Sequence, residues 1–246
     1  MKRTLLLLPA FLLAATVALE SLTPPEAAAN DVVTPLQRLR FGNERYASGE
    51  LLRAHQTLER RSQVAAGQEP FAVIVGCADS RVPPEMVFDQ GLGDLFVVRC
   101  AGNVLGDAAI GSIEYAVEHL HCELVVVLGH ERCGAVDAVL KGGELPGHLA
   151  AFGPAIRPSA TAAKSLGGDA LDQAVRLNAL RIAAELRTSA PILGHEVQSG
   201  KLTIVAARYD LDTGEIDWLD APEESAAEPA PEHEPEPVKP KARSGH

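Results

Sequence analysis

Two short segments of the sequence place cysteine, histidine and acidic side chains at close spacing. The first is Cys77-Ala78-Asp79-Ser80-Arg81, and the second is His130-Glu131-Arg132-Cys133. Two thiolates and one imidazole suit Zn²⁺, which prefers tetrahedral sites of sulfur and nitrogen ligands. Three protein ligands leave the fourth position open, as a catalytic zinc site requires. We therefore expect Cys77, His130 and Cys133 to form a catalytic zinc site.

Other interpretations of the cysteines stay open at this point. Four cysteines in 246 residues are too few for a disulfide scaffold. If the three side chains do not converge, they are ordinary core residues. A purely structural metal site is a further alternative, although it needs a fourth ligand. For Cys100 and Cys122 we expect two buried free thiols, with a disulfide between them as the alternative.

One glycine separates each segment from a short apolar run, residues 71–75 and 124–128, and such runs are typical of strands buried on both faces. Similar runs at 95–98 and 202–207 predict two more strands. Neighbouring parallel strands present their carboxyl ends at one edge of a sheet, where ligands bind. The predicted metal ligands are therefore placed to meet at that edge.

Helical patterns separate the predicted strands. Thr34-Pro35 predicts the start of a surface helix that ends near Ser48-Gly49. An apolar stripe over 110–120 predicts a crossover helix, and 171–186 predicts an amphipathic helix that stops before Pro191.

The remaining segments predict a turn and a loop. A turn at 212–214 precedes an antiparallel edge strand at 216–218. The Gly- and Pro-rich stretch 142–168 predicts a loop with little regular structure. The expected fold class is α/β, with a central, mostly parallel sheet of about four parallel strands plus an antiparallel edge strand, flanked by helices.

The two ends of the chain differ in composition from residues 30–220, the expected catalytic domain. A 15-residue apolar run at 5–19 follows Lys2-Arg3, which is typical of a secretory signal peptide spanning 1–29. This run is shorter than the roughly 20 residues that a membrane-spanning helix needs. We expect cleavage after Ala29, with Ala18 as the alternative, and a periplasmic or secreted product without stable membrane insertion. Residues 221–246 form a Pro- and Glu-rich acidic tail that we expect to be disordered.

Composition excludes several classes of protein. The hydrophobic content is 46%, which is enough for a soluble chain to bury a sizeable core. The net charge of −11 argues against a nucleic-acid partner and against an acidic membrane surface, because both attract basic proteins.

Three motifs, C-x-D-x-R, R-x-A-G-N and H-x-x-C, stand here as residues 77–81, 99–103 and 130–133. Together they resemble the β-class carbonic anhydrases, over about residues 35–218. The resemblance implies a zinc lyase, with one Zn²⁺ per subunit, that interconverts carbon dioxide and bicarbonate by attack of zinc-bound hydroxide. It also implies a homodimer or a dimer of dimers, with each active site near a subunit interface.

The resemblance also implies roles for individual residues. Cys77, His130 and Cys133 hold the zinc. Asp79 either binds the fourth position or pairs with Arg81, which leaves that position open and lets Asp79 accept a proton.

A further set of positions concerns substrate and inhibition. Gln90 matches the position of an amide that hydrogen-bonds substrate. Some bacterial members of the family have an extra bicarbonate site built from a tryptophan, an arginine and a tyrosine. Arg99 and Tyr115 match two of these positions, but Ile74 stands where the tryptophan would be. This departure, with Gln90, implies the open-site type, without cooperative inhibition by bicarbonate.

Two other functions share these residues. A carbon disulfide or carbonyl sulfide hydrolase would use the same ligands on the same fold. A non-catalytic zinc- or bicarbonate-binding homologue would need no open metal position, so the intact Asp79 and Arg81 argue against it.

Overall fold

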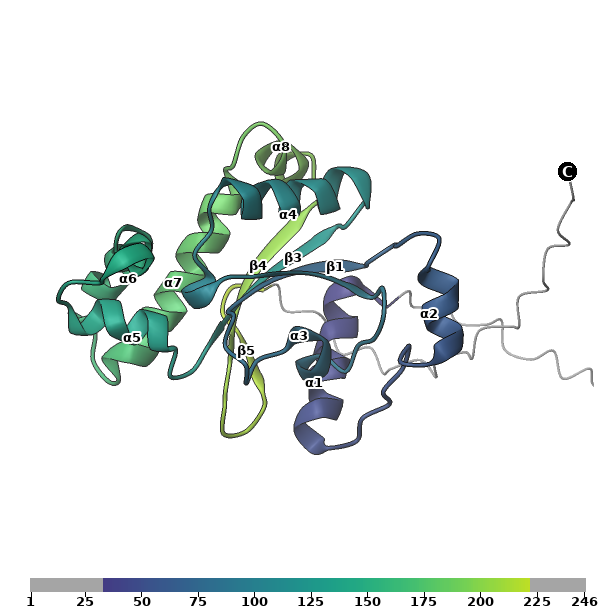
Figure 1. Cartoon of the computed structure of the whole chain (residues 1–246), viewed down its shortest axis with the longest axis horizontal. Helices are drawn as coiled ribbons and strands as arrows, with labels where there is room; N and C mark the ends of the chain where they lie inside the picture. Colours follow the sequence, from purple (N-terminus) through teal and green to yellow (C-terminus); the bar gives the residue numbers. More distant parts are fainter. Residues whose placement is uncertain (1–32, 222–246) are drawn as a thin grey trace, which may run out of the picture. The chain divides into compact units, whose positions relative to one another are not determined.

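The computed structural model describes residues 33–221, and its centre is a five-stranded sheet in the order β2-β1-β3-β4-β5 (Figure 1). Four strands are parallel, and the last is antiparallel to β4. This confirms the predicted sheet, including its antiparallel edge strand. The strands are β1 (Ala72–Gly76), β2 (Leu95–Arg99), β3 (Leu124–His130), β4 (Thr203–Tyr209) and β5 (Ile216–Trp218).

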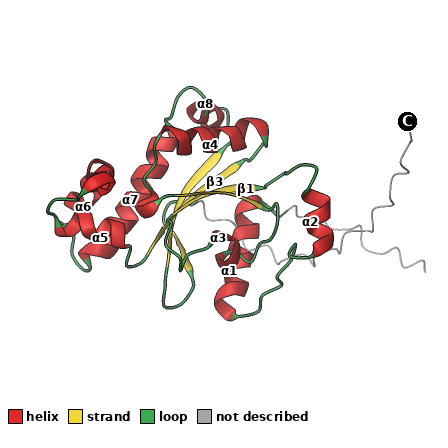
Figure 2. Ribbon diagram, viewed as in Figure 1, coloured by secondary structure: helices red, strands yellow, loops and turns green. Residues whose placement is uncertain are grey.

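Helices cover both faces of the sheet (Figure 2). On one face, α1 (Pro35–Ser48) and α3 (Pro84–Val87) pack against Ile74, Val126 and their neighbours. On the other face, α4 (Asp107–His119), α7 (Ala170–Arg187) and α8 (Leu193–Gln198) pack against the alternate residues of the same strands. Strands β1 and β3 are buried along their whole length, which explains their continuous apolar sequences.

The predicted helix boundaries follow from local hydrogen bonding. Helix α1 begins after Thr34, whose hydroxyl accepts a hydrogen bond from the Gln37 N–H while the Gln37 side chain accepts one from the Thr34 N–H. It ends at Gly49, whose φ of +81° is readily adopted only by glycine. The predicted helices at 110–120 and 171–186 are confirmed as α4 and α7.

The prediction of a loop over 142–168 is wrong. This stretch contains a 3₁₀ turn, η2 (Gly147–Ala151), and helix α6 (Phe152–Ala163). Pro154 lies in the first turn of α6, where a helix does not need its N–H. The buried Ile156 and Ala160 pack on α5 (Gly134–Lys141) and α7, so tertiary packing stabilises a helix that contains Pro158.

One further short helix, α2 (Leu58–Val64), lies between α1 and β1 in the sequence. The predicted signal peptide (1–29) and, apart from Ala221, the predicted acidic tail lie outside the described residues. Within residues 33–221, no helix has both the length and the apolar content that crossing a membrane requires.

Candidate metal centre

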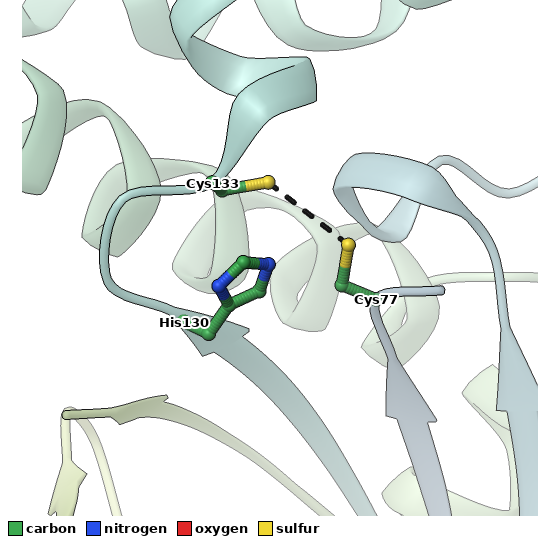
Figure 3. A group of neighbouring side chains, drawn as sticks. All are labelled: Cys77, His130 and Cys133. Atoms are coloured by element: carbon green, nitrogen blue, oxygen red, sulfur yellow. Dashed lines mark hydrogen bonds between the residues drawn. The ribbon is translucent and has the colours of Figure 1, made fainter. Parts of the chain in front are cut away.

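The structure brings together the three predicted ligands at the carboxyl edge of the sheet (Figure 3). Cys77 follows β1, His130 is the last residue of β3, and Cys133 is the residue before α5. All three side chains are buried and point toward one another. Their ligand atoms lie within 4.8 Å of one another, and the two Sγ atoms are 4.0 Å apart.

The imidazole of His130 is oriented for metal binding. Its Nδ1 lies 2.9 Å from the Glu131 carbonyl oxygen, so this nitrogen carries the hydrogen and donates it. The other nitrogen, Nε2, is then a lone-pair acceptor. It is fully buried and has no hydrogen-bond partner among residues 33–221. A buried, unpaired imidazole nitrogen beside two thiols fits a zinc ligand set.

The two thiols share a proton in a way that favours metal binding. Their Sγ atoms are 4.0 Å apart, close enough for a hydrogen bond that either thiol could donate; this contact lowers the pKa of Cys77 and raises that of Cys133. The Gly102 N–H also donates to the Cys77 sulfur, at 3.3 Å, and this favours the thiolate further. The thiolate is the form of cysteine that binds metals.

Asp79 and Arg81 form a bidentate ion pair beside the three ligands. Arg81 Nε lies 2.9 Å from Asp79 Oδ1, and Arg81 Nη2 lies 2.8 Å from Asp79 Oδ2. These bonds hold the pKa of Asp79 well below its usual range. Asp79 Oδ2 also lies 3.8 Å from Nε2 of His130. Of the two arrangements expected for Asp79, the structure contains the pair with Arg81.

Three residues that the sequence analysis gave no such role also shape the site. The Arg99 side chain donates to the Cys77 carbonyl oxygen at 2.7 Å and to the Asp79 carbonyl oxygen, which fastens the segment that carries both. Gly102 and Asn103 contact the ends of the ligand-bearing strands from the 3₁₀ turn η1 (Ala101–Asn103). All three residues belong to the R-x-A-G-N motif, which was the signal that the sequence offered, but the contacts that they make depend on tertiary structure.

Gln90 is not joined to the ligands by any hydrogen bond described within residues 33–221. Its side chain is buried, donates to the Phe88 carbonyl oxygen at 2.7 Å and accepts a bond from Arg38 at 3.2 Å. Its role in binding substrate stays a prediction.

The three residues that were compared with the extra bicarbonate site have different surroundings. Ile74 is fully buried in β1, whereas Tyr115 is exposed on α4, with its ring 5.2 Å from that of His119. Arg99 is committed to the backbone near Cys77.

The remaining cysteines are free thiols, as expected. Cys122 is buried, donates to the Pro70 carbonyl oxygen at 3.1 Å, and has its pKa raised to about 11 by burial. Cys100 is only half-buried, which differs from the expectation of two buried thiols.

Comparison with known proteins agrees with this geometry. The carbonic anhydrase family model matches residues 72–216, which include all three ligands. Carbonic anhydrase 2 of Mycobacterium tuberculosis is 42% identical over 186 residues, which cover 74% of this chain and 90% of that protein.

Solved structures are similar over most of the described residues. A tetrameric β-carbonic anhydrase of Sordaria macrospora aligns with a TM-score of 0.60 and 25% identity, covering 74% of this chain and 94% of that one. The Coccomyxa β-carbonic anhydrase in complex with acetazolamide aligns with a TM-score of 0.58 and 30% identity, covering 75% and 86%. The chain belongs to the β-class carbonic anhydrase family.

Proposed function

We propose that this protein is a zinc-dependent carbonic anhydrase that reversibly hydrates carbon dioxide to bicarbonate and a proton. One observation carries the proposal: three buried ligands, Cys77, His130 and Cys133, converge beside an Asp79 that Arg81 holds bidentately. Zn²⁺ fits this set because its donors are two sulfurs and one nitrogen. When bound, the metal would lower the pKa of its water to about 7 and so supply hydroxide at neutral pH.

Asp79 is the residue proposed to handle the proton. Its pKa lies well below the usual range because Arg81 donates two hydrogen bonds to it, so it is ionised at neutral pH. An ionised carboxylate held in this orientation accepts a hydrogen bond from water at the site. Because its low pKa makes Asp79 a weak base, it would hold a proton only briefly before the proton passes to solvent, and its lasting contribution is the orientation of the water.

The proposed substrate contacts follow the same segment. Val82 is buried, and its N–H donates to the Asp79 carbonyl oxygen, so the apolar stretch Val82-Pro83-Pro84 begins directly beside the ion pair. Apolar side chains suit carbon dioxide, which is uncharged and poorly solvated. Gln90 is the proposed amide contact.

The proposal is tested by removing and restoring the metal. The purified protein is expected to contain one Zn²⁺ per chain, to lose carbon dioxide hydration on treatment with a chelator, and to regain it with added zinc. Acetazolamide, which a Coccomyxa relative binds, is expected to inhibit. If the zinc-loaded protein hydrolysed carbon disulfide but did not hydrate carbon dioxide, the substrate would be wrong. If it did neither, the binding-protein alternative would replace an enzyme.

We further propose that the enzyme is exported and forms a homodimer or a dimer of dimers. The apolar run at 5–19 supports export, and the tetrameric relative from Sordaria macrospora supports assembly. N-terminal sequencing of the protein recovered from the periplasm or the medium is expected to begin at Asn30; a start at Leu19 would indicate the alternative cleavage site, and a start at Met1 would contradict cleavage.

A further inference from the structure

We propose that Asn103 is a positioning residue that sets the separation between Cys77 and His130. The inference rests on the proposed zinc site, and it concerns how the fold holds two of its ligands at the correct distance.

The backbone pairing of the two ligand-bearing strands stops before the ligands. The last paired residues of β1 and β3 are Gly76 and Leu128. Cys77 comes one residue after this pair on β1, and His130 comes two residues after it on β3. The hydrogen bonds between these two strands therefore end before the ligands, although β3 remains paired with β4 as far as His130.

The side-chain amide of Asn103 connects the two strands near this point. Its Nδ2 donates to the Val75 carbonyl oxygen at 2.9 Å and to the Leu128 carbonyl oxygen at 2.9 Å. Each carbonyl lies two residues before a ligand, one on each strand. Both partners are acceptors, so the nitrogen rather than the oxygen of the amide must face them. Asn103 thus joins the two strands where their own pairing ends.

Asn103 is itself held firmly. It is only 3% exposed, and its φ of +58° lies in the left-handed region, which asparagine adopts more readily than most residues. The preceding Gly102 has a φ of +64°, and a Cβ there would lie 2.8 Å from Cδ1 of Ile156. The Gly102 carbonyl oxygen accepts a hydrogen bond from Asn178 at 2.9 Å. Because these contacts fix the turn, the side-chain amide of Asn103 has little conformational freedom.

The test compares Asn103→Gly with a matched control, Asn43→Ala. Glycine keeps the left-handed backbone and removes the amide without adding charge. Asn43 is also a buried amide, 5% exposed, whose Nδ2 donates to two carbonyl oxygens, those of Val87 and Gly214. It joins α1 to other elements and makes no bond to the ligand-bearing strands. Alanine suits its position inside a helix.

The zinc dissociation constant is measured by competition with a chromophoric chelator, alongside the thermal midpoint of the metal-free protein. Both variants are expected to lower the midpoint. Only Asn103→Gly is expected to weaken zinc binding, by about 10- to 100-fold, the usual cost of losing a group that orients metal ligands. Substitution of Co²⁺ for zinc provides a second readout, because the sulfur-to-metal absorption should change only in this variant.

Zinc binding by Asn103→Gly within about threefold of the wild type would overturn the inference, as would equal weakening in both variants. If Asn103→Gly does not fold, Asn103→Asp carries the same expectation, because it keeps the shape of the side chain and loses the donors. Failure of the wild-type protein to bind zinc would instead contradict the proposed function, so the two failures are distinguishable.

Discussion

At the scale of single residues, the site depends on where hydrogens are placed. His130 donates from Nδ1 to a backbone carbonyl and so presents the lone pair of Nε2 to the space between the thiols. The contact between Cys77 and Cys133 lowers the pKa of Cys77 and so favours its thiolate. Asp79 is kept ionised by Arg81. The Cys77 thiolate, the lone pair of His130 Nε2 and the ionised Asp79 are the forms that the proposed chemistry needs, and metal binding would displace the proton of Cys133.

The role of Asp79 is tested by Asp79→Asn, which keeps the shape of the side chain and removes its charge. Hydration is expected to fall by about 100-fold or more, because the variant cannot accept the proton. Zinc content should not change, since the three ligands are intact. Stopped-flow hydration and metal analysis measure both quantities.

The control for this variant is Asp217→Asn, which breaks a different ion pair, with Arg176. It should keep the hydration rate. A full rate in Asp79→Asn would remove Asp79 from the mechanism, and loss of zinc would make it a ligand instead.

The residues that would bind the metal could be predicted from the sequence, whereas the contacts that hold those residues in place could not. Cys77, His130 and Cys133 could be predicted because metal ligands have distinctive residue types and spacing. Arg99 donates to backbone carbonyls in the segment that follows β1, and Asn103 donates to backbone carbonyls of β1 and β3; any residue provides such a carbonyl. Such partners have no sequence signature, so the R-x-A-G-N motif marked both residues but only the structure showed which contacts they make.

At the scale of elements, the turn after β4 is hydrogen-bonded to Glu131 and Arg132, the two residues between the ligands His130 and Cys133. Arg132 forms two hydrogen bonds with Asp212, at 2.9 and 2.7 Å, and Glu131 accepts one from the Leu211 N–H at 3.2 Å. Within the turn, the Asp210 carboxylate accepts bonds from the Thr213 N–H at 3.0 Å and from Arg208 at 2.7 Å. The turn therefore helps to hold the segment that carries His130 and Cys133.

The Asp210 carboxylate gives a pH-dependent prediction. The Thr213 N–H and Arg208 lower its pKa from 3.8 to about 2 in the folded protein. Because the folded pKa lies below the unfolded one, its stabilisation is present above about pH 4 and is lost as the pH falls toward 2. Asp210→Asn should therefore lower the free energy of unfolding by about 1 to 2 kcal/mol at pH 7, and by progressively less below pH 4.

Thr213→Ala is the control, because it removes the hydroxyl that accepts the Glu215 N–H in the same turn without removing a titrating group. Its effect on stability, measured by urea unfolding, should stay constant over this pH range. A difference between wild type and Asp210→Asn that does not shrink in acid would contradict the assignment.

Helices and strands were predicted correctly where a local sequence pattern determines them. The prediction failed where tertiary packing determines the structure. The apolar runs of β1 and β3 and the cap of α1 at Thr34 determine their elements locally. Helix α6 contains Pro154, Pro158 and Gly153, which local rules assign to loops. Its burial against α5 and α7 overrides those preferences, and that burial depends on residues distant in the sequence.

At the scale of the whole molecule, strand β2 is an unpaired edge of the sheet within the described residues. Its five residues are all half-buried, although their sequence, Leu-Phe-Val-Val-Arg, is mostly apolar. An apolar edge strand offers unpaired backbone groups to another chain. This edge is where a second copy would be expected to bind in the proposed homo-oligomer.

Val97→Lys tests this edge, because a charged side chain on an edge strand opposes pairing with a second copy. The wild-type protein is expected to sediment as a multiple of its chain mass, and the variant should shift toward the monomer. Leu166→Lys, which replaces a leucine that is 46% exposed elsewhere, should leave the assembly unchanged. An unchanged assembly in Val97→Lys would place the interface on another surface.

The most direct test of the central claim is stopped-flow carbon dioxide hydration by the zinc-loaded chain, measured from about pH 6.5 to about pH 9, which spans the expected water pKa of about 7. We predict a rate that is proportional to bound zinc and is already present at the low end, because an Asp79 that pairs with Arg81 would leave the fourth position of a bound zinc open to water. Absence of hydration at every pH in fully zinc-loaded protein would contradict the claim.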